Sequence, residues 1–500
     1  MERAILHSDA NCFYASVEML YHPEYAGKPL AVGGDPEARH GIVLTANYIA
    51  KRSGVKTGMA LWQAKQVCPD LIFVPPRMDL YLKFSFMLRE IYSEYTNQIE
   101  PYGCDEAWLD VTGSSSLKGN GRMIAEEISR RVKKELGITV SVGISWNKIF
   151  AKLGSDYKKP DAITEFNKAN YQDLIWKLPV SDLLYVGRST NRTLQKYGIR
   201  TIGELARTDP SFLERQLGKM GLVIYSFANG WDDSPVSAEG YQAPIKSIGN
   251  STTAPRDLEN DQDVQIILMA LAESVAARLR KHGFKCNVVS ISIRDNGLFH
   301  FSRQRKLQEP TDITDEIMSA AYQLFRENYH WPCPIRSLGI RADDLVMGQV
   351  PVQLDLFMNE QRREKQEKLD RAVDDIRRRF GYHSVQRAFM HQDKILSSLD
   401  AQGSHTVHPG WIFQWEVSAL NDNKVYVEVI VKFSTEGAMM PIEFIWEDGT
   451  KYLIDKVKSK ERCASRKAGG TGIMYTVMVD GKECHLYYEF DKWFMERKSA

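Results

Sequence analysis

The chain begins with a short apolar run that ends at Asp9. After it, stretches with an apolar residue at every third or fourth position alternate with short strand-like runs. Strand, helix, strand, turn, strand, helix, strand is the split βαββαβ plan, an α+β sheet with helices on one side. The runs that predict it are strands at 3–9, 99–103, 107–111 and 138–144 and helices at 80–98 and 123–136.

The same order of elements recurs later and predicts a second βαββαβ unit at 245–345. Between the two units, residues 170–231 are rich in helical spacing, and residues 232–244 contain Pro235, Gly240 and Pro244, which is typical of a linker. The second unit rests on strands at 246–251, 287–295, 297–304 and 335–342 and helices at 261–282 and 312–329.

The last part of the chain has a different pattern. Residues 360–380 predict a charged helix, and its narrow apolar stripe, expected to dock on a neighbour, consists of Leu369, Val373, Ile376 and Phe380. An alternating run at 424–433 predicts a strand. Further on, Asp-Gly pairs at 448–449 and 480–481 separate alternating runs, which is a strong hairpin signal. Residues 440–497 therefore predict a small all-β module.

Composition excludes several classes of protein. A chain of 500 residues with 43% hydrophobic and 26% charged residues is globular, with roughly three to five folding units. No apolar run approaches the ~18 residues of a membrane span, and the seven cysteines lie far apart with no CxxC pair, so no disulfide framework or zinc site is expected. A reducing cytosol is the expected compartment. Net charge is +1, but basic residues gather at 278–285 and 294–306.

Three carboxylates suggest the chemistry. Asp9 ends the first strand, and Asp105 and Glu106 lie in the tight turn of the central hairpin. In a split βαββαβ sheet the first strand is a neighbour of that hairpin, so the three acids can meet at one edge. Like charges that close need a cation, and hard oxygen ligands suit Mg²⁺. Two such ions can hold an in-line phosphoryl displacement.

Four sequence blocks resemble the Y-family translesion DNA polymerases of the bacterial DNA polymerase IV type. Asp-Ala-Asn-Cys-Phe-Tyr-Ala-Ser-Val-Glu at 9–18 is similar to the opening of that family, and Tyr-Gly-Cys-Asp-Glu-Ala-Trp-Leu-Asp at 102–110 is similar to its catalytic turn. Thr-Ala-Asn-Tyr-Ile-Ala-Lys-Arg at 45–52 and Ser-Val-Gly-Ile-Ser-Trp-Asn-Lys at 141–148 also match. The blocks keep the family's order and spacing, and the resemblance runs from residue 4 to about 390.

The resemblance implies a right-hand polymerase. Its parts would be a palm at 1–26 and 78–169, fingers at 27–77, a helix-hairpin-helix thumb at 170–231, a linker at 232–244, a little finger at 245–345, a clamp-binding motif and charged helix at 346–397, and a tail at 398–500 that holds the all-β module. These parts leave no room for an ordinary proofreading exonuclease. The tail lies outside the resemblance.

The resemblance also assigns the reacting site. It makes Asp9, Asp105, Glu106 and the Ala10 carbonyl the ligands of two Mg²⁺ ions, with Mn²⁺ as a substitute. Tyr14 would be the steric gate that packs under the sugar of the incoming dNTP, with Phe13 beside it. Lys51 falls where the family has arginine, so either Lys51 or Arg52 would contact the triphosphate. The other residues expected at the triphosphate are Thr45, Tyr48 and Lys159.

DNA and a sliding clamp are the implied partners. Gly187 lies in a turn of the thumb that either presents backbone N–H groups to phosphate or is simply a structural turn. Gln-Leu-Asp-Leu-Phe at 353–357 resembles bacterial sliding-clamp ligands, through Gln353, Leu354, Leu356 and Phe357. The basic residues expected to grip the primer-template are Lys148, Lys152, Arg278, Lys281, Lys285, Arg303 and Arg305.

The function implied is error-prone synthesis across damaged template, by a monomer without membrane contact. One alternative is a diguanylate-type cyclase, whose Gly-Gly-Asp/Glu-Glu-Phe turn is missing here, and another is a clamp- and DNA-binding scaffold with a lapsed active site. In the tail, the basic stretch at 456–467 predicts either a nucleic-acid or protein contact or a solvated hairpin edge.

Overall fold

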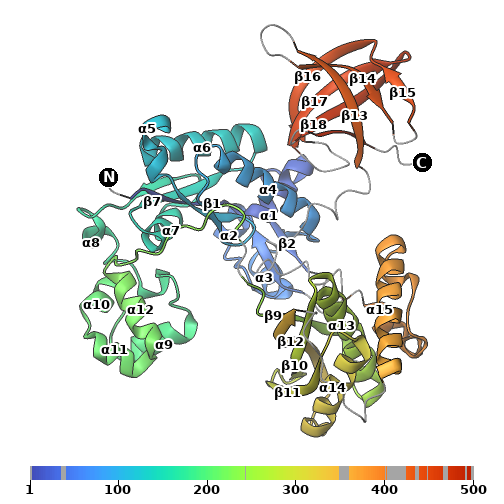
Figure 1. The fold of residues 1–500 in the computed structure, drawn as a ribbon. Helices are drawn as coiled ribbons and strands as arrows, with labels where there is room; N and C mark the ends of the chain where they lie inside the picture. The colour runs from blue at the N-terminus through green and yellow to red at the C-terminus, as the bar shows by residue number, and fades with distance from the viewer. Residues whose placement is uncertain are drawn as a thin grey trace. The chain divides into compact units, whose positions relative to one another are not determined.

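The computed structural model describes residues 3–34, 41–241, 244–347, 360–399, 401, 424–433, 439–446, 449–464, 471–489 and 492–496. The chain divides into two compact units (Figure 1), and each is described by itself. The first contains residues 1–11, 79–240 and 410–500, and the second contains residues 12–78 and 241–409. The α+β class predicted from the sequence is confirmed.

A five-stranded sheet forms the centre of the first unit. Its order is β5-β6-β1-β7-β8, so that β1 lies in the middle, as the split plan requires. Both β6 and β7 pair antiparallel with β1, whereas β8 runs parallel to β7. The strands are β1 (Ile5–Ala10), β5 (Ile99–Pro101), β6 (Glu106–Asp110), β7 (Val140–Ser145) and β8 (Ile163–Glu165).

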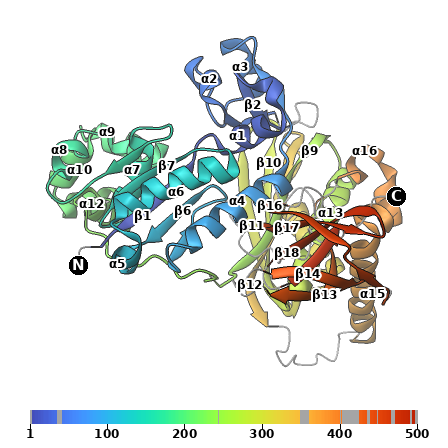
Figure 2. The same cartoon turned by 90° about the horizontal axis from the view of Figure 1, so that it is seen from above.

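Helices cover both faces of this sheet, which corrects the expectation of helices on one side. Helix α4 (Met78–Ser93) contacts one face, where Tyr92 hydrogen-bonds Ser8 of β1. Helix α6 (Gly121–Leu136) lies on that same face, while α7 (Lys148–Tyr157) packs on the other (Figure 2). Gly143 of β7 permits this approach, since a Cβ there would lie 1.9 Å from a backbone oxygen of α7.

Further helices, and the extended segment that follows them in the chain, complete this part of the first unit. The helices are α8 (Tyr171–Leu174), α9 (Arg188–Lys196), α10 (Ile202–Arg207), α11 (Pro210–Leu217) and α12 (Lys219–Ala228). The segment at 232–244 was predicted to be a linker. In the structure, Val236 and Ser237 of this segment pack against the five-stranded sheet. Val236 is buried with Ile5 and Trp108, and Glu100 of β5 accepts hydrogen bonds from the Ser237 amide and hydroxyl.

The second unit begins with a small three-stranded sheet in the order β3-β2-β4. Its core is formed by small and aliphatic side chains such as Ala31, Val43 and Leu61. The elements are α1 (Phe13–Tyr21), β2 (Leu30–Gly33), β3 (Val43–Ala46), α2 (Tyr48–Arg52), α3 (Leu61–Val67) and β4 (Ile72–Val74).

A four-stranded antiparallel sheet forms the other part of the second unit. Two helices, α13 (Asp261–Lys281) and α14 (Thr314–Asn328), cover one face and share its hydrophobic core. The strand order is β11-β10-β12-β9, so the first strand lies at an edge rather than in the middle. The two predicted βαββαβ units thus have the same order of elements but different folds. The strands are β9 (Ser247–Leu258), β10 (Phe284–Asp295), β11 (His300–Thr311) and β12 (Ile335–Met347).

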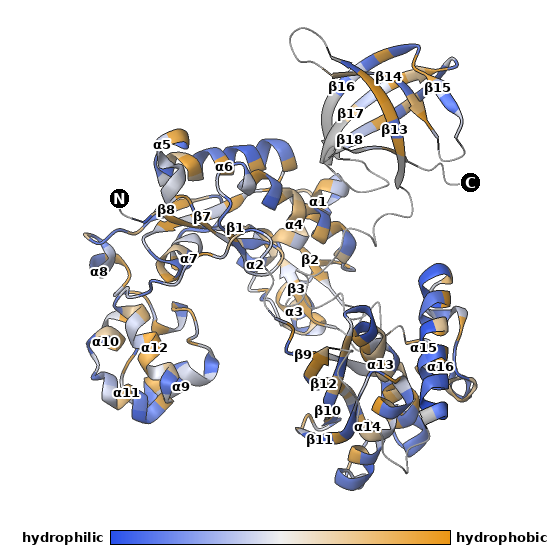
Figure 3. Ribbon diagram, viewed as in Figure 1, coloured by the Kyte–Doolittle hydropathy of each residue, from blue (hydrophilic) through white to orange (hydrophobic). Residues whose placement is uncertain are grey.

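Helix α15 (Glu360–Phe380) docks through charges, not through the apolar stripe that the sequence suggested. Figure 3 shows the helix hydrophilic over most of its length. Arg363, Asp370 and Arg377, seven residues apart, are buried, whereas Leu369 and Phe380 are exposed. Arg280 of α13 pairs with Asp370 and Asp374, and Arg363 pairs with Glu316 of α14. The spacing of apolar residues predicted the helix correctly, but the prediction of which face of the helix is buried was wrong.

The predicted all-β module is one seven-stranded sheet, in the order β15-β14-β13-β19-β18-β17-β16, that also includes the strand at 424–433. Between the edge strands β15 and β16, the Ile454 amide donates to the Ile442 carbonyl of β14 and the Asp455 amide donates to the Met478 carbonyl of β17. The final strand then pairs back with the first. The strands are β13 (Lys424–Phe433), β14 (Met439–Ile445), β15 (Lys451–Leu453), β16 (Lys456–Ala464), β17 (Thr471–Val479), β18 (Lys482–Glu489) and β19 (Lys492–Glu496).

Two further expectations concern membranes and disulfides. Among the described residues, no helix combines the length and the apolar character needed to cross a membrane. Cys12, Cys68, Cys104, Cys286, Cys333 and Cys484 are free thiols.

Candidate active site

The predicted carboxylates meet at the ends of two paired strands. Asp9 of β1 stands opposite Glu106 of β6 in the antiparallel register, and the Ala10 amide donates to the Asp105 carbonyl at 3.0 Å. Asp9 is 6% exposed, and Asp105 and Glu106 are half-buried. The sequence argument placed these three acids at one edge because the first strand neighbours the central hairpin, and the register confirms that.

The turn before Glu106 depends on a glycine. Gly103 has a φ of +85°, which disfavours any residue with a Cβ. The Tyr102 amide donates to the Glu106 carbonyl at 2.8 Å and closes the turn between β5 and β6. This geometry presents Asp105 at the tip, beside the end of β1.

Two lysines balance the acids. Lys159 Nζ lies 2.6 Å from Asp9 Oδ2 and 2.8 Å from Asp156 Oδ1. Lys152 of α7 pairs with Glu106 Oε2, and its ammonium lies 4.9 Å from the centre of the Tyr102 ring. Lys159 and Lys152 were predicted to contact the triphosphate and DNA, respectively, and the structure places both at the carboxylates.

Burial and mutual repulsion perturb the acids. Burial, followed by the charge of Glu106, raises the pKa of Asp105 to about 6, and the same two causes raise the pKa of Asp9 against the pull of Lys159. Burial also opposes the ionisation of Glu106, but His7 and Lys152 outweigh it and lower its pKa. The pKa of Lys159 is raised because Asp9 and Asp156 outweigh its desolvation.

The donor set fits a hard divalent cation in kind. Asp9 and Asp105 supply carboxylate oxygens whose repulsion a cation would relieve, and such oxygens are the ligands that Mg²⁺ prefers. Within the described ranges, no three His, Cys, Asp or Glu side chains are already arranged around one point. A cation would therefore have to displace the lysine ammonium groups from Asp9 and Glu106.

The residues predicted around the nucleotide lie in the second unit. Phe13 is 1% exposed and packs inward, while Tyr14 is half-buried with its ring 5.7 Å from that of Phe13. Tyr48 begins α2, and Lys51 lies 5.0 Å from the centre of its ring. Thr45 is half-buried on β3, whereas Lys51 and Arg52 are exposed on α2. Their approach to one substrate with the carboxylates stays a prediction.

Sequence reasoning missed the residues that hold this group in place. Asn47 caps α2 by accepting from the Ala50 amide at 3.0 Å, and its Nδ2 donates to the Lys28 carbonyl at 2.8 Å. Glu18, 2% exposed, makes a two-pronged pair with Arg77 at 3.1 and 2.5 Å. An Asn before a helical run was the available signal for the first.

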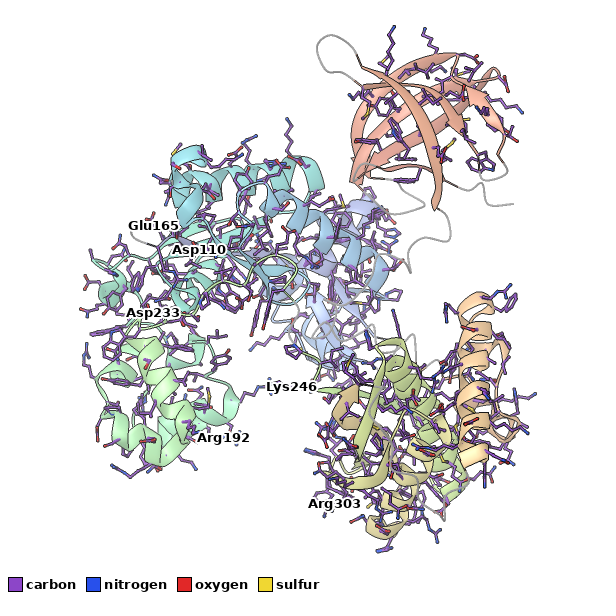
Figure 4. The ribbon with its side chains drawn as sticks, in the orientation of Figure 1. Asp110, Glu165, Arg192, Asp233, Lys246 and Arg303 are labelled. Carbon is purple, nitrogen blue, oxygen red and sulfur yellow. The ribbon has the colours of Figure 1, made fainter. Side chains whose placement is uncertain are left out.

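The predicted DNA contacts in the first unit have structural partners. Lys148 pairs with Glu100 at 2.6 Å and lies 4.8 Å from the centre of the Trp108 ring. Gly187 is the N-cap residue immediately before helix α9, and a Cβ there would meet nothing within 4 Å. With Tyr102 and Lys152 it also lines a cavity of about 400 Å³. Figure 4 shows Arg192 on this helix.

The alternation of side chains along β11 shows on which face of the four-stranded sheet two of the predicted DNA contacts lie. Arg303 and Arg305 of β11 lie opposite Ile291 and Val289, the side chains of β10 that face the helices. Arg305 pairs there with Glu327 of α14 at 2.6 Å, and Figure 4 labels Arg303. Arg278 donates to the Gly249 carbonyl, Lys281 is exposed, and Lys285 pairs with Glu367 at 2.9 Å.

The opposite, open face of the sheet carries Arg294 and Lys306, which belong to the basic stretch predicted from the sequence, and Arg341, which sequence reasoning passed over. Arg294, Lys306 and Arg341 are exposed on β10, β11 and β12. Between them, Ser302, Ser292, Gly339 and Ser251 form one row across the four strands. Gly339 is needed in that row, since a Cβ there would lie 2.5 Å from Ser292 Oγ. Successive side chains of a strand point to opposite faces, so the sequence already indicated that Lys306 and Arg305 of β11 lie on different faces.

The predicted clamp motif, Gln353, Leu354, Leu356 and Phe357, lies outside the described residues.

Comparisons with known proteins agree with this geometry. Residues 8–156 match the model of the impB/mucB/samB family, and residues 245–356 match the C-terminal domain of that family. The DNA polymerase IV of Acetivibrio thermocellus is 51% identical over 399 residues, which are 80% of this chain and 100% of that protein. The DNA polymerase IV 1 of Bacillus subtilis is 39% identical over 388 residues, 77% of this chain and 92% of that protein.

A solved Y-family DNA polymerase chimera superposes with a TM-score of 0.61 and 25% identity over 69% of this chain and 99% of that chain. Fold, carboxylates and relatives together define the class as a DNA-directed DNA polymerase. The chain belongs to the impB/mucB/samB family, the Y-family polymerases of the DNA polymerase IV type. The resemblance predicted from the sequence is confirmed.

Proposed function

We propose that this chain copies damaged DNA by two-metal nucleotidyl transfer from a dNTP to a primer 3′ hydroxyl, with release of pyrophosphate and without proofreading. The observation that carries the proposal is the pairing of Asp9 with Glu106, beside Asp105 at the tip of the hairpin. Bound Mg²⁺ would supply charge neutralisation and activation of the attacking oxygen. Asp9, Asp105, Glu106 and the Ala10 carbonyl would hold the ions.

The parts of the chain take the roles that the family implies. The five-stranded sheet is the palm, residues 27–77 the fingers, residues 170–231 the thumb and the four-stranded sheet the little finger. Tyr14 is the steric gate, and Thr45, Tyr48, Lys51 or Arg52, and Lys159 receive the triphosphate. Because Lys159 sits 2.6 Å from Asp9, it must leave that carboxylate to take this role.

The open face of the little finger is the proposed grip on duplex DNA. Small residues, serine and glycine, along its middle row leave the backbone accessible, and Arg294, Lys306 and Arg341 supply positive charge. These contacts neutralise phosphates without reading the base sequence, so binding weakens with salt. Arg305 and Lys285 pair with Glu327 and Glu367, and Arg303 packs on Phe301. On the open face Arg341 also pairs, with Asp343 at 2.9 Å, so Arg294 and Lys306 are the residues that favour this face.

Two further roles belong to the proposal. Residues 353–357 recruit a bacterial sliding clamp as an extended peptide, and the enzyme acts as a cytoplasmic monomer.

The test is primer extension on undamaged and abasic templates with Mg²⁺, comparing the natural protein with Asp105→Ala. Short products from the natural protein on both templates, absent with the variant, support the proposal. Absence of extension by the natural protein would favour a scaffold with a lapsed active site.

A further inference from the structure

The all-β module near the end of the chain has no role in the proposed function. The two matched family domains end at residue 356, and the module consists of the seven strands between residues 424 and 496. Its hydrophobic core lies on one face of the sheet, where Val429, Phe444 and Tyr452 are neighbours across β13, β14 and β15. Because side chains alternate along a strand, the residues next to these three point to the opposite, outer face.

An apolar patch lies on the outer face of these three strands. Ile430 of β13 and Leu453 of β15 are 52% and 66% exposed, and each stands opposite Glu443 of β14 in the strand register. A bulge in β14 adds Ile442, which has no cross-strand partner on β13 and is also exposed. The exposed apolar side chains of the patch are Ile430, Met440, Ile442 and Leu453. Neighbouring exposed apolar side chains of this kind mark a contact surface more often than isolated ones do.

Glu443 lies at the centre of the patch and is more buried than the aliphatic side chains on either side. Its side chain is only 20% exposed. The Oε1 atom is buried, and among the described residues no donor hydrogen-bonds to it. The ammonium of Lys451 lies 3.9 Å away, beyond hydrogen-bond distance, on a side chain that is 67% exposed. A carboxylate oxygen that has lost water without gaining a donor is costly, so a cationic donor brought to this point would bind favourably.

The charge at the centre of the patch selects the class of partner. Phosphate groups of a nucleic acid or a lipid would be repelled by Glu443 and by the exposed Glu428, although Lys432 and Lys451 stand at the edge of the patch. A second copy of the patch, related by a two-fold axis through its centre, would bring two Glu443 carboxylates together. A cationic side chain of another protein, with apolar residues beside it, matches both the acid and the aliphatic side chains around it.

We propose that the outer face of β13, β14 and β15 binds a protein segment that places an arginine side chain between Ile430 and Leu453, where it pairs with Glu443. A guanidinium suits this position because it is weakly hydrated and donates several hydrogen bonds in one plane. A charged contact enclosed by apolar side chains that exclude water is typical of the residues that dominate a protein interface. The proposal goes beyond nucleotidyl transfer, because none of these residues belongs to the carboxylate site.

Selection from a display library of short random peptides tests the proposal. The full natural chain and the full Glu443→Gln chain are used as parallel targets, and the peptides enriched by the natural chain are synthesised with a fluorescent label. Fluorescence anisotropy then gives the Kd of each peptide for the natural chain and its variants. We expect the enriched peptides to share an arginine with apolar residues on both sides. An empty selection, or enriched peptides without a basic residue, would overturn the proposal.

Glu443→Gln should raise the Kd of these peptides about tenfold or more, because the amide keeps the shape of the side chain and removes its charge. Leu453→Ser should raise it about threefold or more, since part of the apolar enclosure is lost. The matched control is Glu483→Gln on β18 of the same module, whose carboxylate is 49% exposed and pairs with Lys458 at 2.7 Å. This control should change the Kd by less than about twofold. Equal Kd values for the natural chain and Glu443→Gln would overturn the proposal.

Two measurements on the free chain separate this docking role from a structural role and from self-association. Thermal unfolding should show Glu443→Gln to be no less stable than the natural chain, because Oε1 has no donor to lose. A lower melting temperature would show instead that Glu443 holds the module together, and would overturn the proposal. Sedimentation at increasing protein concentration should show no dimer that Leu453→Ser abolishes. Such a dimer would assign the patch to a second copy of this chain and would likewise overturn the proposal.

Discussion

Arg377 of α15 and Glu273 of α13 form an ion pair of 3.0 Å in which the two side chains are 4% and 5% exposed. The hydroxyl of Tyr382 donates to the same carboxylate at 3.1 Å, and Arg387 lies 3.5 Å from its other oxygen. A charge buried this deeply is tolerated because its partners are also charged and fixed in place. The helix after the proposed clamp motif is thus held by electrostatics within the second unit.

Glu273→Ala should weaken the docking of α15, which Arg280 and Arg363 continue to hold. Removal of Glu273 leaves the buried Arg377 guanidinium without a carboxylate partner, although it still donates to the Val385 carbonyl, and breaking a buried ion pair in this way typically costs about 3–5 kcal/mol. Hydrogen–deuterium exchange of the full chain should show α13 and α15 exchanging faster. The exposed pair Arg378–Asp375 on the same helix is the matched control, and Asp375→Ala should change stability by less than about 1 kcal/mol. Equal protection in both variants would contradict this reading of the helix.

The carboxylate site should make the metal-free protein less stable as pH rises. The pKa of Asp105 is about 6 in the folded chain and 3.8 as its ordinary value, so the folded state binds the proton more tightly. Between about pH 4 and 6, stability therefore falls as pH rises, by about 3 kcal/mol for a shift of this size.

Asp105→Asn removes this titration. In EDTA at pH 7.5, the variant should melt at a higher temperature than the natural protein. The difference between the two melting temperatures should become smaller by pH 4. A gap that stays constant over this range would show that Asp105 is not the group responsible.

Tyr14→Ala should relax sugar selection. With the ring gone, a 2′ hydroxyl meets less obstruction, and the ratio of kcat/KM for ribonucleotides to that for deoxynucleotides should rise roughly tenfold or more. Tyr14→Phe keeps the ring and should keep the selectivity. Unchanged selectivity in Tyr14→Ala would remove this residue from the gate.

The two faces of the four-stranded sheet should differ in their effect on DNA binding. Replacing Arg294, Lys306 and Arg341 by Ala should weaken duplex binding and reduce the slope of log K against log salt by about three, close to one for each phosphate that is no longer neutralised. Fluorescence anisotropy at several salt concentrations measures both. Arg303→Ala with Arg305→Ala is the matched variant on the helix side, and a larger effect there would reverse the assignment of the faces.

The clamp motif is tested by substituting its two terminal hydrophobic residues. Leu356→Ala with Phe357→Ala should abolish stimulation of synthesis by a sliding clamp, because such peptides bind through a few buried apolar anchors. Distributive synthesis without the clamp should be unchanged, since these residues follow the little finger. Stimulation that persists would refute the motif.

The sequence by itself determined the order of elements and the meeting of three carboxylates at one edge of the sheet. The apolar run that ends at Asp9 and the Asp105–Glu106 turn were enough to place three acids together, because strand adjacency in a split βαββαβ sheet follows from the order of elements. The block at 9–18 also identified the family. Helix α15 was found at its observed bounds, since its 3.6-residue period is strong.

Tertiary structure alone decided which faces meet. Leu369 and Phe380 of α15 are exposed and Arg377 is buried, because partners on α13 are distant in sequence and leave no local period. Lys306 and Arg305 are neighbours in the chain, yet they point to opposite faces of the sheet, and only strand pairing shows which face the helices cover. The sequence predicts only that His7 is an interior strand residue. The structure shows that Ser155 of α7 lies beside one ring nitrogen and Glu106 of β6 lies near the other. The local spacing of apolar and polar residues determines which elements form. Which face of each helix or strand is buried is determined by contacts with segments that are distant in sequence.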